Sequence, residues 1–399
     1  MKTKKIIAVV LLICLAFTGA ISVGQVRAKK AAGTSEGSEE YYEALQELLE
    51  SVPQVDCDAL YALHPAEEVV AHVGGRDVTW GEYFQHFCTY ISNIEEYMMQ
   101  SVLYYGTSIA WNDTYDEASG LRWKDLPGIY AGEQLRQYAA IANFAEENGI
   151  ALSAENAALA DSVIEQAKLS ACGGDASDEE FNEYLRESYL TEPLYRKLVE
   201  ASLLYQQMFT DLYGENGSGV SDEDAVGYME ENGYIHADCI LFATRDSTTG
   251  ESFGEEETKA IKDRAALAAS ELREETDAEK RFTLFEEYKK EYDGDSARSY
   301  FPNGYTYTAG SLGIPGFEEA AVGLEEYGTA DVLESSYGYY VIMRLPLDPD
   351  AEIEYSDSGT ALTGRSKFAN EDYSLRLQEK MNAEEVVFAD GFTVPEISA

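Results

Sequence analysis

The stretch IHADCILF, residues 235–242, decides the fold of this chain. Its apolar run is short and is bounded by polar residues, which favours a β-strand with a buried centre over a helix. Helix-like apolar spacing then recurs twice, over residues 255–273 and again through Phe282, Phe285 and Tyr288. One strand and two helices leave a sheet incomplete, so the strands that pair with 235–242 are expected further along the chain.

The sequence after these helices supplies the rest of that sheet. The expected elements are a turn, a Gly- and Tyr-rich loop, a short helix and closing strands, at residues 292–295, 305–310, 317–321, 332 and 339–345. Residues 234–345 are therefore predicted to form an α+β domain, a small antiparallel sheet covered by helices.

The preceding region, residues 39–233, is predicted to be mostly helical. An amphipathic helix over 39–52 opens it, and alternating residues predict a hairpin over 69–78. Residues 79–82 fit a capping box at the start of an aromatic-rich helix, whose rings are interpreted as core. The Gly- and Ser-rich stretch 215–219 is typical of a linker and marks a domain boundary. No catalytic motif stands out in this region.

The N-terminus has the pattern of a secretory signal. A basic start precedes the uncharged residues 6–26, and small Ala28 follows. This order predicts a signal peptide over 1–28 that directs the protein out of the cytoplasm, with cleavage after Ala28. An uncleaved membrane anchor stays open as an alternative, because residues 6–26 are just long enough to span a bilayer. Lipid attachment at Cys14 is disfavoured by the bulky residue before it.

Charge and cysteine content narrow the possible partners. The formal net charge of −45 gives a surface that repels nucleic acid and anionic lipid, so no nucleic-acid partner is expected. The same charge favours solubility and would also attract basic unfolded chains, and composition does not separate these explanations. The five cysteines form no CxxC, and the four histidines lack zinc spacing, so neither a metal site nor a cofactor is predicted.

Five motifs between residues 237 and 342 resemble the parvulin family of peptidyl-prolyl isomerases. Family domains read approximately A-S/K-H-I-L, Y-S-x-D, G-x-M/L, F-E-x-A-A-F-x-L and V-x-T/S-x-Y/F-G-Y/F-H-I-I. The corresponding segments here are ADCIL, YDGD, GSL, FEEAAVGL and YGYYVI, at residues 237–241, 292–295, 310–312, 317–324 and 337–342. The resemblance implies a parvulin-like fold and isomerase activity toward Xaa-Pro bonds.

The order of segments is similar to that of the SurA/PrsA class of secreted foldases. The similarity implies a signal at 1–28, a helical chaperone-like domain at 39–230, a parvulin-like domain at 231–348 and a C-terminal segment at 349–399. That last segment is expected to form a helix over 366–381 and to pack back onto the helical domain. The expected fold class for the whole chain is α+β.

The resemblance also implies a site. An Xaa-Pro bond rotates slowly because amide resonance gives a barrier of about 18–20 kcal/mol. An isomerase therefore needs an apolar slot for the proline ring and surroundings that favour the twisted amide, and it needs no cofactor. By resemblance, Leu312, Phe317 and Tyr337 bind the substrate, and Asp295 faces the reacting carbonyl.

Two histidines of the family are replaced here, by Cys239 and Tyr340. In the family they hydrogen-bond across adjacent strands beneath the site. A phenol donates well but a thiol accepts poorly, so a Cys–Tyr pair would make a weaker contact. Cys239 is interpreted first as a small buried hydrophobe, whereas Tyr340 fits a core aromatic and a site residue equally well. His236 is expected on the opposite side of its strand and is no substitute.

The sequence therefore predicts an extracytoplasmic folding factor that binds unfolded or proline-containing polypeptides. The first hypothesis is a parvulin-type prolyl isomerase, weakened by the loss of the two histidines. The alternative is a holdase chaperone that binds unfolded segments without speeding rotation. A third hypothesis is an acidic surface module that binds no unfolded peptide. A homodimer through the helical domain has no sequence signature and stays open.

Overall fold

The computed structural model describes residues 52–102, 107–172, 177–246, 248–355 and 359–398. The signal predicted over 1–28 lies outside these residues, as does all but the last residue of the helix predicted over 39–52. No helix in the described part of the chain combines the length and the apolar character needed to cross a membrane. The chain divides into two compact units, one of residues 1–211 with 374–399 and one of residues 212–373.

Helices dominate the first unit. Its helices are α4 (Cys57–Tyr61), α5 (Trp80–Gln100), α6 (Leu126–Glu147), α7 (Ala154–Cys172), α8 (Asp178–Arg186) and α9 (Glu192–Tyr213). Its strands are β1 (Val69–Val73), β2 (Arg76–Thr79), β3 (Thr114–Asp116), β4 (Leu121–Arg122) and β11 (Val386–Phe388), and a short 3₁₀ turn spans Trp123–Asp125. The mostly helical character predicted for this region is confirmed.

The hairpin predicted over 69–78 is present as β1 and β2, and it gains a third strand from the end of the chain. Strand β11 pairs antiparallel with β1, with Ala71 opposite Phe388. The aromatic residues of α5 are core, as expected: Trp80, Tyr83, Phe84 and Phe87 are buried. Burial of these large rings on one helix is a main source of stability for the unit.

The capping box predicted over 79–82 forms only in part. The Thr79 hydroxyl accepts a hydrogen bond from the Glu82 backbone N–H at 3.4 Å. The Glu82 carboxylate does not complete the box, because it accepts a hydrogen bond from the Lys197 ammonium at 2.6 Å. A charged partner from α9 therefore replaces the local backbone partner that the motif predicts.

The second unit carries the elements predicted around residues 235–242, in the predicted order. Its helices are α10 (Asp222–Glu231), α11 (Glu255–Glu274), α12 (Ala278–Tyr292), α13 (Phe317–Val322) and the first half of α14 (Gly364–Ala383), whose residues from 374 on belong to the first unit. Its strands are β5 (Ile235–Ala243), β6 (Tyr305–Tyr307), β7 (Leu333–Glu334), β8 (Gly338–Leu345), β9 (Glu352–Tyr355) and β10 (Ala361–Thr363), and 3₁₀ turns span Glu215–Gly217 and Ser296–Ser299. The α+β class is confirmed.

Residues 215–219 are not an extended linker. They contain a 3₁₀ turn, and Gly217 has a φ of +82°. A Cβ at Gly217 would lie 2.9 Å from the Arg365 carbonyl oxygen, so only glycine fits there. The stretch is therefore packed against the first turn of α14 within the second unit.

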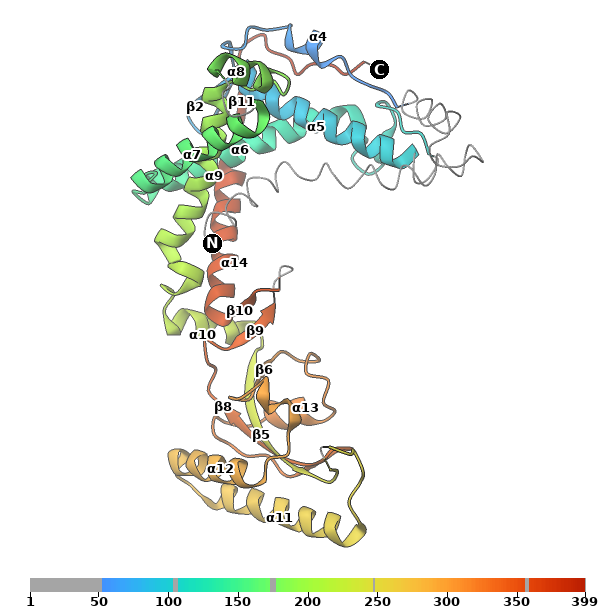
Figure 1. Ribbon diagram of the computed structural model, residues 1–399, viewed down its shortest axis with the longest axis vertical. Coiled ribbons are helices and arrows are strands. Elements are labelled where there is room, and N and C mark those ends of the chain that lie inside the picture. The colour runs from blue at the N-terminus through green and yellow to red at the C-terminus, as the bar shows by residue number, and fades with distance from the viewer. Residues whose placement is uncertain (1–51, 103–106, 173–176, 247, 356–358, 399) are drawn as a thin grey trace. The chain divides into compact units, whose positions relative to one another are not determined.

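The central sheet of the second unit is antiparallel, in the order β6-β5-β8-β7. Helices α11 and α12 cover one face and α13 covers the other (Figure 1). Alternation along β5 sends Cys239 and Leu241 to the α13 face and Ile240 and Phe242 to the face under α11 and α12. The candidate site is built on the α13 face.

Candidate functional site

Asp295 sits in a tight turn that begins directly after α12. Its carboxylate caps the 3₁₀ turn by accepting a hydrogen bond from the Ala297 N–H at 2.9 Å. The turn is fixed to β5 by two further bonds: the Gly294 N–H donates to the Leu241 carbonyl at 2.8 Å, and the Leu241 N–H donates to the Asp293 carboxylate at 2.9 Å. These bonds hold the half-buried Asp295 over the edge of the sheet.

A tyrosine that the sequence analysis did not select contacts this carboxylate. The Tyr305 hydroxyl donates to Asp295 Oδ2 at 2.5 Å, and the Cys239 thiol points to the same oxygen at 3.9 Å. Burial, and then the bond to Asp295, raises the pKa of Tyr305 above its ordinary value. The phenol therefore remains protonated and acts as a donor. The alternation of Tyr305 and Tyr307 was the available signal, since it places both on one face.

Arg298 connects the turn that carries Asp295 to strand β5. Its guanidinium donates to the Asp293 carboxylate at 2.9 Å, to the Asp238 carboxylate at 2.6 Å and to the Cys239 carbonyl at 2.6 Å. Asp238 is only 1% exposed and is also bound by Lys289 at 2.9 Å. Burial disfavours the charge on Arg298, but the attraction of Asp238 and Asp293 outweighs it and raises the pKa. Arg298 is therefore a positioning residue for Asp295.

An aromatic cluster forms the floor beside Asp295. The Phe317 ring is fully buried, and three tyrosine rings meet it edge to face. Its centroid lies 5.9 Å from those of Tyr305 and Tyr340 and 6.2 Å from that of Tyr307. Leu312 is partly buried against the same cluster. Two of the predicted slot residues, Leu312 and Phe317, thus lie on one apolar surface.

Glu318 fixes the loop that carries Leu312. Its carboxylate accepts hydrogen bonds from the Gly310 N–H at 2.5 Å and from the Leu312 N–H at 2.9 Å. These two backbone bonds hold the pKa of Glu318 below its ordinary value. Glu318 is thus a second positioning residue that the sequence analysis did not identify.

Cys239 and Tyr340 are not opposite one another. The register of β5 and β8 places Cys239 opposite Ile342 and Tyr340 opposite Leu241. Both side chains still point to the α13 face, but the thiol is directed to Asp295. Burial raises the pKa of both residues, so each is neutral at ordinary pH. The thiol thus has the Asp295 carboxylate as a hydrogen-bond partner, 3.9 Å away.

Tyr337 and His236 are the remaining residues for which the sequence made a prediction. Tyr337 precedes β8 and is 61% exposed, so it lies outside the buried cluster. His236 is buried, with its ring nitrogens 2.7 Å from the Pro346 carbonyl and 2.9 Å from the Asn303 carbonyl. Its strand position alternates with that of Cys239, as expected. In the described ranges, His, Cys, Asp and Glu side chains form no group of three that would hold a metal ion.

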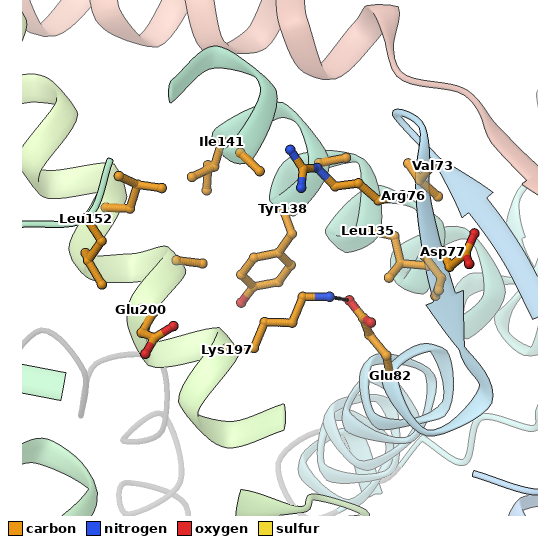
Figure 2. Close-up of a pocket in the computed structure, with 15 residues that line it drawn as sticks. Val73, Arg76, Asp77, Glu82, Leu135, Tyr138, Ile141, Leu152, Lys197 and Glu200 are labelled. Atoms are coloured by element: carbon orange, nitrogen blue, oxygen red, sulfur yellow. Dashed lines mark hydrogen bonds and ion pairs between the residues drawn. The ribbon is translucent and has the colours of Figure 1, made fainter. Parts of the chain in front are cut away.

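A separate cavity of about 310 Å³ lies within the first unit (Figure 2). The Tyr138 ring projects into it from α6, next to the ion pair of Lys197 and Glu82. Burial raises the pKa of Tyr138 to about 12, so its hydroxyl stays neutral. The apolar part of the lining includes Val73, Val78, Leu135, Ile141, Leu152 and Leu204. A cavity of this size and composition fits one or two apolar side chains with a polar end.

Comparison with known proteins gives similarity to solved foldase structures. No family model and no curated protein matches the chain. The foldase protein PrsA from Streptococcus pneumoniae is 17% identical, with 63% of this chain and 79% of that chain covered and a TM-score of 0.20. PrsA from Bacillus subtilis is 18% identical, with 68% and 91% covered and a TM-score of 0.20. The peptidylprolyl isomerase PrsA from Bacillus anthracis is 18% identical, with 63% and 94% covered and a TM-score of 0.20.

The chain is thus similar to solved structures of the foldase class that its motifs resemble. TM-scores of 0.20 carry no weight for the geometry or the activity of this chain. Any function has to rest on the described residues themselves.

Proposed function

We propose that this protein is an extracytoplasmic folding factor whose second unit is a parvulin-type peptidyl-prolyl isomerase of reduced activity, acting on Xaa-Pro bonds of secreted chains. The observation that carries the proposal is the fixed carboxylate of Asp295 beside the apolar surface of Leu312, Phe317 and Tyr340. The signal-like residues 1–28 support the extracytoplasmic location.

This geometry suits amide rotation. A planar Xaa-Pro amide carries partial negative charge on its carbonyl oxygen, and the twisted form carries less because resonance is lost. A carboxylate held next to that oxygen destabilises the planar form more than the twisted one. Apolar walls strengthen the effect by excluding water. Asp295 therefore acts through its charge, and no proton transfer or cofactor is required.

Two features account for reduced activity. The Cys239 thiol is a weak donor where the family has an imidazole, so Asp295 lacks a strong partner on that side. Phe317 is fully buried in the free protein, so a proline ring reaches it only after a neighbouring side chain such as Leu312 moves. Both features add to the cost of binding the transition state.

The test is an isomerisation assay with Xaa-Pro peptides and the purified protein. Asp295→Ala is expected to lower the rate by about tenfold or more, the range for losing one electrostatic contact in an apolar site. Asp263→Ala removes an exposed carboxylate from α11 and is the matched control, expected to be unchanged. A wild-type rate equal to the uncatalysed rate would contradict the proposal.

A gain of activity gives a second test. The double variant Cys239→His and Tyr340→His restores the two histidines that the family carries. We expect its rate to exceed that of the wild type, provided that circular dichroism shows a folded protein. An inactive wild type with an active double variant would identify a lapsed isomerase that retains the fold.

A holdase function is the second candidate, and the cavity of the first unit favours it. Its apolar lining offers a place for a client side chain that does not involve Asp295. Ala201 lines this cavity, so Ala201→Phe should fill it and weaken protection of an aggregating client protein. Ala158→Phe adds the same ring at an exposed position of α7 and should leave protection unchanged. Protection that survives Ala201→Phe would exclude the cavity as the client site.

A further inference from the structure

Cys57 in α4 lies against the face of α5 that carries Cys88. Two contacts, one on each side of Cys57, fix how α4 runs along α5. The Tyr61 ring packs on Phe84, with centroids 5.1 Å apart, and the Val55 N–H donates to the Glu95 carboxylate at 2.6 Å. The two segments therefore run antiparallel.

Helical spacing places Cys88 between those two contacts. It lies one turn after Phe84 and two turns before Glu95, so all three share one face of α5. Cys57 lies between Val55 and Tyr61 on the facing segment. The antiparallel arrangement therefore brings the two cysteines level with each other.

The two thiols are close enough for each to shift the pKa of the other. Cys88 is buried in the core of the first unit, and Cys57 packs against that core while remaining partly exposed. The neighbouring Cys88 side chain lowers the pKa of Cys57, because it stabilises a thiolate there. The same proximity, together with burial, raises the pKa of Cys88. Cys57 is therefore the accessible and more nucleophilic member of the pair.

We propose that Cys57 and Cys88 form a disulfide bond under oxidising conditions, so that the pair is a redox-sensitive cross-link between α4 and α5. Among the described cysteines the pairing is specific, because Cys172 and Cys239 pack in two other hydrophobic clusters. An extracytoplasmic location would expose the pair to such conditions. The inference is otherwise independent of isomerase activity.

The oxidant is a small-molecule disulfide, and the reaction is thiol–disulfide exchange. The Cys57 thiolate attacks one sulfur of the oxidant, which forms a mixed disulfide and releases one small thiol. The Cys88 thiol then loses its proton and attacks the Cys57 sulfur, which releases the second small thiol. Two protein thiols are oxidised by two electrons, and one disulfide is reduced to two thiols.

The bond would stabilise the start of the described chain. Helix α4 has only five residues, too few for a helix to persist without tertiary contacts. A link from Cys57 to Cys88 closes a loop that contains the β1–β2 hairpin. Closing a loop of this size restricts the unfolded chain and should raise the melting temperature by about 5–10 °C.

The test uses the full chain, reduced or treated with oxidised glutathione, then alkylated in denaturant and mapped by mass spectrometry. We expect one linked peptide pair, containing Cys57 and Cys88, and alkylated Cys172 and Cys239. The oxidised protein should melt at the higher temperature, and dithiothreitol should reverse the shift. Cys88→Ala should abolish the shift, whereas Cys172→Ala should retain it.

Three outcomes would overturn the inference. They are full alkylation of Cys57 and Cys88 after oxidation, linkage between other cysteines, and arrest at a glutathione adduct of Cys57. Because the peptide map is made on the wild type, the result does not depend on whether the Cys88→Ala variant folds.

Discussion

The two faces of the β6-β5-β8-β7 sheet are built from different side chains. The face under α11 and α12 is mainly aliphatic and phenyl, with Ile240, Val341 and Phe285 among its buried residues. Tyr339 is buried there as well, and Tyr288, Tyr292 and Tyr327 are partly buried. The buried acid Asp238 on this face is paired with Lys289 and Arg298. The α13 face instead gathers a thiol and three phenols, from Cys239, Tyr305, Tyr307 and Tyr340.

The difference matters because polar groups are costly to bury. A core needs only apolar volume, and a buried hydroxyl without a partner costs about 1–3 kcal/mol. Tyr307 carries such a hydroxyl, since no described residue bonds to it. The hydroxyl of Tyr305, by contrast, is used to bind Asp295. The α13 face thus gathers phenols around one carboxylate, and one of them, Tyr307, has a hydroxyl without a partner among the described residues.

The largest expected effect is on the packed face. Phe285→Ala removes a fully buried ring and should lower the free energy of unfolding by about 3–5 kcal/mol. Hydrogen exchange of the β5 amides measures this, because the three tryptophans, at 80, 111 and 123, all lie in the first unit. Leu267→Ala, at an exposed position of α11, is the control and should cost less than about 0.5 kcal/mol.

The next effect concerns the ion pairs of Asp238. Arg298→Ala leaves this buried carboxylate with Lys289 and the Cys239 N–H and releases the turn of Asp295, so we expect a loss of about 2–3 kcal/mol. Isomerase activity should fall as well, because Asp295 is no longer held. Arg298→Lys keeps the charge but lacks the planar guanidinium with its several donors. Its stability and its isomerase activity should lie between those of the wild type and those of Arg298→Ala. A variant as stable and active as the wild type would show that Arg298 positions nothing.

Local pattern predicted the elements of this domain but not the contacts between them. The strand predicted at 235–242 spans 235–243, and the helix predicted at 255–273 spans 255–274, because apolar spacing is a local signal. The bond from Tyr305 to Asp295 depends on the pairing of Ala237 with Tyr305, which brings together distant parts of the sequence. Periodicity does not specify such a register.

The positioning residues were missed for the same reason. Arg298 and Glu318 are charged residues in or beside loops, where sequence alone gives no preferred partner. Their roles appear only when the fold brings Asp238 to one and the Gly310 and Leu312 amides to the other. The proposed slot residues Leu312 and Phe317 could be selected because the family motif carries them, whereas the polar residues around them could not.

A pair of tyrosine variants compares hydroxyls on the α13 face directly. Tyr305→Phe removes the bond to Asp295 and should cost about 1 kcal/mol, together with a several-fold loss of isomerase rate. Tyr307→Phe removes a hydroxyl that has no partner among the described residues, so stability should be unchanged or slightly higher. Equal effects of the two changes on stability and rate would refute a special role for Tyr305.

The smallest effect is a pH dependence at the edge of the same face. The Gly310 and Leu312 N–H groups hold the folded-state pKa of Glu318 below the ordinary value of 4.5. Its stabilising contribution is therefore complete above pH 4.5 and is lost as the pH falls through the lowered pKa. Glu318→Gln lacks this contribution, so its difference from the wild type should be present at neutral pH and shrink in acid.

Hydrogen exchange of the Gly310 and Leu312 amides across this pH range measures the loss directly. Glu319→Gln, an exposed neighbour on α13, controls for the change in net charge. If the two variants show the same profile, the loop is held by apolar contacts of Leu312 alone. If only Glu318→Gln loses protection, a single carboxylate on α13 sets the position of the slot, and the polar residues of this face extend from Asp295 to the loop that would grip proline.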